Sequence, residues 1–586
     1  MAKSRRSRST ARLKALEACL EEPAGRYRSL RGTGDFAAYL DAEADLADEE
    51  ILTEPILDSI IRNVLGFPVD AYFPQRGKGG LKPDFTPMDL VAHPFVLDAK
   101  ASQQKLETHE GQIRRYITQR SLDWGILFNL HEVRVYRRGA SGHDLALSFP
   151  LLPLWRLARG EAIDVGELAT FEAFCETFAF RRMGLAEQIE HVRSQESWTS
   201  RLARGEEAEV DVEFLVAQLR FLSGRLADDA AAQSASFEDF VRFRPGRETK
   251  LLEELRLLAL DIVPGTDLEQ LPVRVEDWVG ARGLPGRAWR QYLLRVAYLA
   301  LTRILLYRAW EDVDFIDSYL YDGGFDREYG RLAEDVRRVL EEAFLHGSER
   351  YHWIYGRENN YDWFRPREQA LVEVLYRLSP FPLGKLDADV LGALYQTYVE
   401  EIDRDRLGQF YTPRSVVRFM LDRVGFTGPN GIFCLEGDER KPKRLLDFAT
   451  GSGGFLVDAA RRVIDESGID LEEPRELKEA LAAIATGFVG GEISPFPYYL
   501  TEINLLLQVS RLLGRIRVGG ERAQLFTLGV LRVDTLKSKT MPARSLERLD
   551  ARHRADRAEL VEEQRFEMVP LDGEKLEIYR RLREED

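Results

Sequence analysis

Residues 445–456 read Leu-Leu-Asp-Phe-Ala-Thr-Gly-Ser-Gly-Gly-Phe-Leu, and this segment constrains the fold more than any other. The apolar residues before Asp447 predict a buried parallel strand, and the apolar spacing from Phe455 to Ile464 predicts a helix. The glycines between them predict a tight turn whose backbone N–H groups approach a ligand closely. A strand, a glycine turn and a helix in this order therefore predict a ligand-binding turn.

This segment resembles motif I of the S-adenosylmethionine-dependent DNA adenine-N6 methyltransferases, Asp-Pro-Ala-X-Gly-Ser-Gly-Gly-Phe, with Phe448 in place of the proline. Upstream, residues 408–413 match the family's Gly-X-Phe-Tyr-Thr-Pro element, which covers the methionine end of the cofactor. The resemblance implies that this chain binds S-adenosylmethionine. The cofactor-binding residues that it implies in these two motifs are Phe410, Tyr411, Thr412, Asp447, Ala449, Thr450, Gly451 and Gly453.

Two acidic residues further along the chain extend the resemblance. Residues 488–493 predict a second strand that ends at Glu492, whose carboxylate would accept both ribose hydroxyls, as in a Rossmann-like unit. Glu492 lies farther along the chain than is usual for this role, and the charged helical segment 465–485 accounts for the difference. Residues 532–536 resemble the family's Asp-X-Leu element, which implies that Asp534 reaches the adenine amino group of the cofactor.

The family's catalytic motif IV, (Asn/Asp/Ser)-Pro-Pro-(Tyr/Phe), does not occur in these 586 residues. In the family its side chain and backbone carbonyl accept the hydrogens of the adenine amino group, and its aromatic residue stacks on the flipped base. The chain ends at Asp586, about where the strand before motif IV is expected. We therefore expect this chain alone to bind cofactor without transferring methyl groups, either as the N-terminal part of a longer protein or as the product of an interrupted reading frame.

A second catalytic pattern lies nearer the N-terminus. Residues 51–65 have apolar side chains at helical spacing, with Glu54 near the start of the predicted helix. Asp84 follows Pro83 after a basic, glycine-rich loop. The next predicted strand presents Asp98 and Lys100 on one face, because side chains two apart in a strand align.

This order of residues resembles the PD-(D/E)xK nucleases, in which Pro-Asp is followed by Asp-X-Lys or Glu-X-Lys. The resemblance implies that Asp84 and Asp98 hold Mg²⁺, a hard cation that favours oxygen ligands, and that Lys100 helps to activate or orient water. A Gln-X-X-X-Tyr helix, found in the type I restriction-like branch of the superfamily, and two strand-like segments follow. The complete set of candidate nuclease residues is Glu54, Asp84, Asp98, Lys100, Gln112 and Tyr116. Such domains also persist without cleavage activity, so an inactive domain stays an alternative.

The fold class that we predict is α/β multidomain. It combines a PD-(D/E)xK nuclease-like α/β domain, an all-helical connector and an incomplete Rossmann-like methyltransferase domain. Long helical periodicity with few strand signals supports the connector. The predicted domains are a basic flexible arm (1–35), the nuclease-like domain (36–160), the helical connector (161–385) and the adenine-N6 DNA methyltransferase domain, truncated before motif IV (386–586).

Composition sets further limits. Three widely spaced cysteines predict neither a disulfide framework nor a metal site and fit a reducing cytoplasm. The most apolar stretch, residues 292–306, is interrupted by Arg295 and Arg303, so we expect no membrane span. The net charge of −16 argues against indiscriminate binding along DNA but allows a local basic cleft.

The function that we predict is a restriction-modification or phage-defence protein that acts on double-stranded DNA. It would combine S-adenosylmethionine-dependent adenine-N6 methylation with a Mg²⁺-dependent endonuclease domain, as fused type IIG-like enzymes do. Motif IV and the target-recognition domain would lie in a missing C-terminal part or on a partner chain. Two alternatives stay open: a catalytically incomplete, cofactor-sensing DNA-binding subunit, and a nuclease that the cofactor regulates without methyl transfer.

Overall fold

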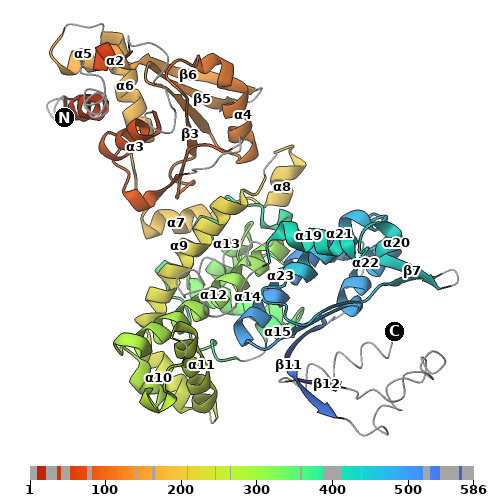
Figure 1. Cartoon of the computed structure of the whole chain (residues 1–586). Helices are drawn as coiled ribbons and strands as arrows, with labels where there is room; N and C mark the ends of the chain where they lie inside the picture. The colour runs from red at the N-terminus through yellow and green to blue at the C-terminus, as the bar shows by residue number, and fades with distance from the viewer. Residues whose placement is uncertain are drawn as a thin grey trace. The chain divides into compact units, whose positions relative to one another are not determined.

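The chain divides into two compact units (Figure 1). The first comprises Met1–His191, Ser200–Gln218 and Tyr376–Phe381, and the second comprises Val192–Thr199, Leu219–Leu375 and Pro382–Asp586. Helices α7 (Leu185–Arg193), α8 (Trp198–Ala203), α9 (Val212–Ala231) and α16 (Glu368–Leu378) contribute residues to both. The computed structural model describes residues 10–21, 36–40, 53–74, 82–139, 142–161, 165–206, 209–243, 246–263, 265–356, 359–386, 412–436, 439–518, 528–540 and 566–570.

The first unit is built on a six-stranded sheet with the order β1-β2-β3-β4-β5-β6. Strands β3 and β4 are parallel, whereas the other neighbouring strands are antiparallel. A parallel pair needs a crossover connection, and helix α4 (Glu110–Gln119) supplies it. The strands are β1 (Tyr72–Pro74), β2 (Phe85–Pro87), β3 (Phe95–Ala99), β4 (Trp124–Phe128), β5 (Glu132–Gly139) and β6 (Gly142–Pro150), and the other helices are α2 (Phe36–Leu40), α3 (Glu54–Asn63), α5 (Leu151–Ala158) and α6 (Val165–Phe178).

Helix α4 packs closely on strand β4 because Gly125 has no side chain. A Cβ atom at this position would lie 2.6 Å from Ile113 Cγ1 and 2.9 Å from Ile117 Cδ1. On α3, Ile56 and Ile60 are buried in the core that the strands share. The predicted helix at residues 51–65 and the predicted strands after Gln112 are thus confirmed in type and order.

The start of the chain differs from the prediction of a flexible arm over residues 1–35. Residues 10–21 are helical, and Leu13, Leu16 and Leu20 are buried in the core of the first unit. The reason is the spacing of these leucines, which places them on one face of a helix. The serines and arginines of residues 4–8, which suggested an arm, precede this helix.

The second unit begins with a helical part that contains a long, buried helix. Helix α12 (Gly283–Asp312) is buried along most of its length, including Arg303 and Arg308. Among the helices that the structure describes, none is both long and apolar enough to cross a membrane. The other helices of this part are α10 (Ser234–Arg242), α11 (Arg247–Ile262), α13 (Gly324–Arg331), α14 (Val336–Ser348) and α15 (His352–Tyr355).

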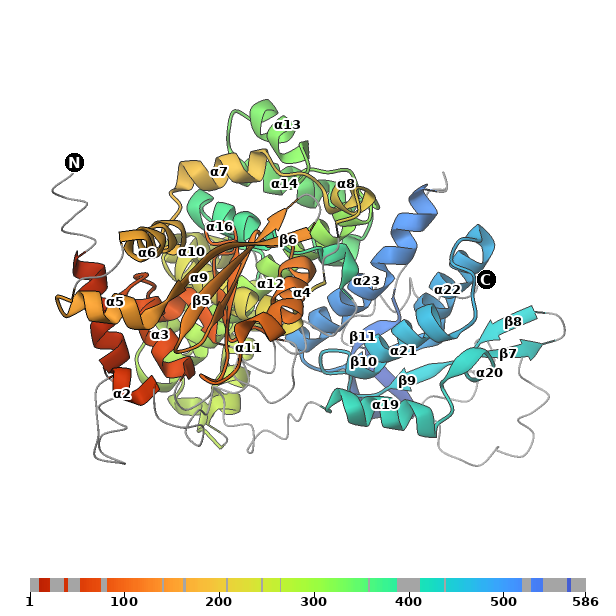
Figure 2. The ribbon, with the colours of Figure 1, turned by 90° about the horizontal axis from the view of Figure 1, so that it is seen from above.

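The rest of the second unit contains a sheet with the order β12-β11-β10-β9, of which β9, β10 and β11 are labelled in Figure 2. Strands β9, β10 and β11 are parallel, and β12 is antiparallel to β11. Helices α21, α22 and α23 pack against this sheet. The elements are α19 (Arg414–Arg423), α20 (Gly428–Ile432), the hairpin β7 (Phe433–Glu436) and β8 (Glu439–Pro442), β9 (Leu445–Asp447), α21 (Gly454–Glu466), α22 (Pro474–Gly487), β10 (Phe488–Glu492), α23 (Pro495–Val518), β11 (Val530–Thr540) and β12 (Phe566–Pro570).

Helix α23 connects this sheet to the helical part of the same unit. A Cβ atom at Gly514 would lie 2.1 Å from the carbonyl oxygen of Val313, so the end of α12 approaches α23 closely. The Tyr351 hydroxyl donates a buried hydrogen bond of 2.9 Å to Glu502. The helical part and the sheet therefore form one packed body, and mixed helices and sheets in both units confirm the predicted α/β class.

Strand β9 is parallel to β10, as predicted, but it is not fully buried. Leu446 is 47% exposed, and the neighbouring Phe448 is also exposed. The reason is position: β9 is the last strand of the sheet within the described residues, so one of its edges has no neighbouring strand there. The prediction of a buried strand was therefore wrong for Leu446.

Candidate functional site

The glycine turn after β9 has the backbone that its sequence predicts. Gly451 and Gly453 have φ angles of +55° and +92°, a region that favours glycine, and α21 begins at Gly454. A Cβ atom at Gly453 would lie 2.9 Å from Thr501 Cγ2. Glycine at residue 453 therefore satisfies both a backbone conformation and a close approach of α23.

Asp447, at the end of β9, has two carboxylate oxygens with different surroundings. Its Oδ1 accepts a hydrogen bond from the Ala449 N–H at 3.2 Å, whereas Oδ2 is buried without a hydrogen-bond partner in the part of the chain that the structure describes. Burial raises the pKa of Asp447. Since a buried polar atom without a partner is costly, Oδ2 marks a place where a polar ligand would bind.

Glu492 ends the neighbouring strand and lies beside the same turn. Strands β9 and β10 pair in register, with Asp447 opposite Gly490, two residues before Glu492. The Glu492 carboxylate accepts hydrogen bonds from the N–H groups of Gly451 at 3.0 Å and Ser494 at 2.8 Å. Burial raises the pKa of Glu492, and Asp447 adds to this effect. The two predicted acidic residues therefore face one turn from neighbouring strands.

Two residues of α23 that the sequence analysis missed hold the turn in place. The Thr501 hydroxyl donates to the Gly451 carbonyl at 2.8 Å, and the Asn504 amide donates to the Ser452 carbonyl at 2.9 Å. Both side chains are buried. The signal that could have found them is polar residues on the inward face of an otherwise apolar helix, because buried polar groups need partners.

Of the other predicted cofactor residues, the structure describes some and leaves others outside the described residues. Thr412 directly precedes Pro413 and the first turn of α19, and the Thr450 N–H donates to the Gly491 carbonyl at 3.1 Å. Asp534 lies on β11, the third parallel strand, but its side chain is outside the described residues. Phe410 and Tyr411 also lie outside them.

In the first unit the predicted nuclease residues gather around β3. Asp98 lies on this strand, and its Oδ2 forms a buried ion pair of 2.7 Å with Lys100 Nζ. Lys100 also donates to the Ala99 carbonyl at 2.8 Å. The Ala99 N–H donates to Asp84 Oδ2 at 2.5 Å, which places the Asp84 carboxylate against the same strand.

Burial has the largest effect on the electrostatics of this cluster. The pKa of Asp84 is raised to about 8, mainly by burial and then by the charge of Asp98. The Ala99 N–H and Lys100 lower this pKa, and Glu54 adds a small increase. A divalent cation between the carboxylates would relieve this repulsion, and carboxylates are ligands that Mg²⁺ prefers. Within the described residues, no three His, Cys, Asp or Glu side chains are arranged to hold a metal ion.

Helix α4 brings the last two predicted residues to the cluster. The Gln112 amide donates to the Tyr116 hydroxyl at 2.7 Å. Burial raises the pKa of Tyr116 to about 12, and the charges of Asp98 and Asp84 add to this effect while Lys100 opposes it. The six residues predicted from sequence thus interact with one another in the first unit, through charge or through the Gln112–Tyr116 hydrogen bond.

The family model described as N-6 DNA Methylase matches residues 386–516. Two curated relatives are 28% identical to this chain. They are the type I restriction enzyme MjaIX methylase subunit of Methanocaldococcus jannaschii, over 22% of this chain and 19% of the relative, and the type I restriction enzyme EcoEI methylase subunit of Escherichia coli, over 20% of each. The second unit therefore contains an N-6 DNA methylase domain, and the chain spans about a fifth of the length of these relatives.

A solved structure, the cryo-EM structure of a DrdV–DNA complex, has 13% sequence identity to this chain. The superposition covers 90% of this chain and 40% of the DrdV chain. Its TM-score of 0.26 is too low to indicate a shared fold. The family match, not this structure, connects the chain to DNA methylation.

Proposed function

We propose that this chain belongs to a restriction-modification protein that methylates adenine N6 in double-stranded DNA with S-adenosylmethionine. The observation that carries the proposal is the arrangement of Asp447, the glycine turn and Glu492 inside the segment that matches the N-6 DNA Methylase family. The two curated relatives that match part of this chain are methylase subunits of type I restriction enzymes.

The residues around the turn suit this cofactor. The buried Asp447 Oδ2 would accept a donor of the cofactor, and Glu492 would accept the ribose hydroxyls, for which it would exchange its present backbone donors. The positive φ angles of Gly451 and Gly453 let the cofactor approach the backbone. The cofactor supplies the methyl group when it is bound.

Further residues would complete the cofactor site. Thr412 would close on the methionine end of the cofactor, with Phe410 and Tyr411 beside it. Asp534 would reach the adenine amino group. Motif IV, which must position the target adenine, would come from a C-terminal part of the protein or from a partner chain.

The test is calorimetric titration of the protein with S-adenosylmethionine. We expect Asp447→Ala to weaken binding by at least about 100-fold, because the variant removes the acceptor at the end of β9. Glu479→Gln, at a half-buried residue of α22 that pairs with Arg475, is the control and should bind like the wild type. Unchanged affinity of Asp447→Ala would refute the cofactor site.

We further propose that the first unit is a PD-(D/E)xK endonuclease domain. Asp84 and Asp98 would hold Mg²⁺, and Lys100 would orient water toward a phosphate. Support comes from the order of α3, β1–β3, α4 and β4, which brings Glu54, the acidic pair and the Gln112–Tyr116 pair together.

Cleavage of unmethylated duplex DNA in the presence of Mg²⁺ tests this second activity in the full-length protein. The double variant Asp98→Ala, Lys100→Ala should abolish cleavage and leave S-adenosylmethionine binding unchanged. Cleavage at the wild-type rate by this variant would show that the nuclease assignment is wrong.

A further inference from the structure

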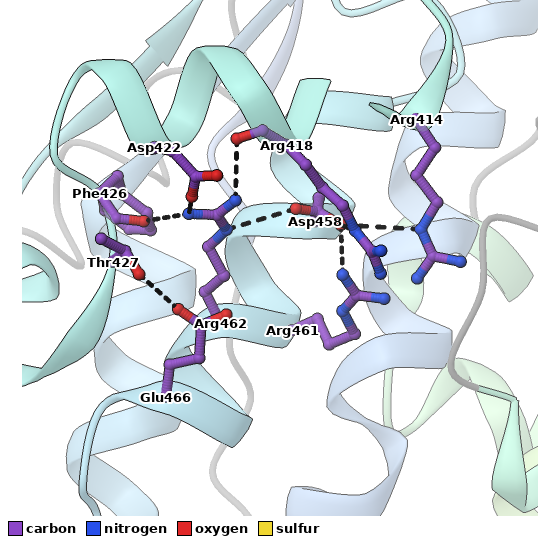
Figure 3. Close-up of polar contacts among 9 residues, drawn as sticks. All are labelled: Arg414, Arg418, Asp422, Phe426, Thr427, Asp458, Arg461, Arg462 and Glu466. Carbon is purple, nitrogen blue, oxygen red and sulfur yellow. Dashed lines mark hydrogen bonds and ion pairs between the residues drawn. The ribbon is translucent and has the colours of Figure 1, made fainter. Parts of the chain in front are cut away.

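A single buried carboxylate on α21 is shared by four arginines. Asp458 is 4% exposed, and Figure 3 shows the guanidinium groups that surround it. Two of the arginines come from α19 and two from α21 itself. The distances to the Asp458 carboxylate are 3.8 Å from Arg414, 3.4 Å from Arg418, 2.5 Å from Arg461 and 3.4 Å from Arg462.

One of these arginines forms hydrogen bonds from all three of its guanidinium nitrogens and so holds the two helices together. Arg462 is buried and donates from Nη1 to Asp422 at 2.6 Å and to the Phe426 carbonyl at 2.9 Å. Its Nη2 donates to the Arg418 carbonyl at 3.0 Å. Because these bonds reach α19 and the loop after it, Arg462 fixes α19 against α21 (Figure 3).

The two arginines of α19 are different, because their side chains reach solvent. Arg414 is 43% exposed and Arg418 is 48% exposed, and each meets Asp458 through its Nε atom. Within the described part of the chain, Asp458 is the acidic partner of both. The four guanidinium groups outnumber Asp458 and Asp422, the two carboxylates that they contact, so the cluster carries excess positive charge on a chain whose net charge is −16.

The position of the cluster relates it to the cofactor turn. Arg414 is the first residue of α19, two residues after Thr412, and Asp458 lies about one helical turn after the glycine turn. The helix dipole at the N-terminus of α19, where Arg414 lies, also favours an anion. An anion held by Arg414 and Arg418 would therefore lie close to the proposed methyl donor.

We propose that Arg414 and Arg418 bind a backbone phosphate of duplex DNA and so hold the duplex beside the cofactor turn. Guanidinium groups match phosphate oxygens in geometry and charge, and Asp458 holds both side chains in place before the phosphate arrives. This inference rests on the proposed function, in which DNA is the substrate. Since a phosphate contact carries no sequence information, the contact would serve every recognition site equally.

The experiment is fluorescence anisotropy with a labelled duplex of arbitrary sequence, measured over a series of salt concentrations. We expect the double variant Arg414→Gln, Arg418→Gln to bind about tenfold more weakly at low salt. The slope of log K against log salt should become shallower by about 1, because the two arginines together neutralise one phosphate. Arg423→Gln is the matched control, because Arg423 lies on the same exposed helix, over Phe419 and outside the cluster; it should retain the wild-type slope.

Three readouts separate the possible outcomes. Equal affinity and slope for the double variant and the Arg423→Gln control would overturn the proposal. Weaker binding of S-adenosylmethionine with unchanged DNA binding would also overturn it, because the anion would then be the cofactor's carboxylate. Loss of binding to polyglutamate without loss of binding to the duplex would overturn it in favour of an acidic protein partner.

The proposed function fails independently of this experiment. If the wild-type protein does not bind S-adenosylmethionine, the cofactor site is wrong, whereas the salt slope of the arginine variant still reports on the phosphate contact. Melting temperatures of all variants, measured in parallel, confirm that each one is folded.

Discussion

Each unit of the molecule has a pair of acidic side chains beside its sheet, and the two pairs have different hydrogen-bond and ion-pair partners. In the first unit, Asp98 faces Lys100, and Asp84 is left with a pKa of about 8. In the second unit, Glu492 accepts two backbone N–H groups, and Asp447 keeps one buried oxygen without a partner in the described residues. In the first unit a lysine is the partner of the acidic pair, whereas in the second unit backbone N–H groups are the partners.

This difference suggests a different ligand for each pair. Charge repulsion between carboxylates is relieved best by a divalent cation, which suits a nuclease. Carboxylates that already face N–H groups of a glycine turn suit hydroxyl and amino groups of an organic cofactor. The same residue types thus predict different chemistry because their neighbours differ.

The largest effect is expected from a methyl group added to the glycine turn. Gly453→Ala places a Cβ atom at a φ of +92° and 2.9 Å from Thr501 Cγ2. We expect the free energy of unfolding to fall by about 3 kcal/mol and cofactor binding to be lost. Denaturant unfolding and calorimetry measure these effects, and Gly330→Ala, at a helical position with open space around it, is the control. A fully stable Gly453→Ala variant would show that the turn is not constrained as described.

A smaller effect is expected at Glu492. Glu492→Gln removes the charge that would accept the ribose hydroxyls and leaves one backbone donor facing an amide group. We expect S-adenosylmethionine affinity to fall about 30-fold, or ~2 kcal/mol, with Mg²⁺ affinity unchanged. A cofactor affinity within twofold of the wild type would show that Glu492 does not accept the ribose hydroxyls.

The acidic pair of the first unit predicts a pH dependence of stability. The pKa of Asp84 is about 8 in the folded state and about 4 in the unfolded state, so the folded state binds more protons between these values. Stability therefore falls as pH rises from 4 to 8. Asp84→Asn should flatten this decline, and Mg²⁺ should raise the melting temperature at pH 8 by a few degrees in the wild type, but not in the variant. A pH profile of stability that Asp84→Asn leaves unchanged would contradict the assignment.

The smallest effect is expected at Thr501, which supports the turn through a hydrogen bond to the Gly451 carbonyl. Thr501→Val keeps the shape of the side chain and removes its hydrogen bond to the Gly451 carbonyl. We expect a loss of about 1 kcal/mol in unfolding free energy and less than about fivefold in cofactor affinity. Thr486→Val, which removes a hydrogen bond within α22, should cost no more than this. A larger loss of affinity than of stability would indicate direct contact with the cofactor.

Local patterns predicted much of this molecule. The turn at Gly451 and Gly453, the strand that ends at Glu492 and the helix that carries Gln112 and Tyr116 each follow from short-range spacing. The support from Thr501 and Asn504 could not be predicted in this way, because it depends on how α23 packs across the turn. The exposure of Leu446 likewise depends on which strands flank β9.

The arginine cluster illustrates the same limit. Arg414 and Arg418 are four apart on one helix and could be expected to share a face. Their common partner, Asp458, is 40 residues away from Arg418 and meets it only because α19 packs on α21. Sequence spacing alone therefore predicts a charged helix face but not the buried carboxylate that organises it.

The most direct test of the central claim is a crossed calorimetric titration of Asp447→Asn and Asp98→Asn with S-adenosylmethionine and with Mg²⁺. We predict that Asp447→Asn loses the cofactor and keeps Mg²⁺, and that Asp98→Asn loses Mg²⁺ and keeps the cofactor. Binding of both ligands to both variants with wild-type affinity would contradict the assignment of a different ligand to each acidic pair. Loss of both ligands from one folded variant would contradict it as well.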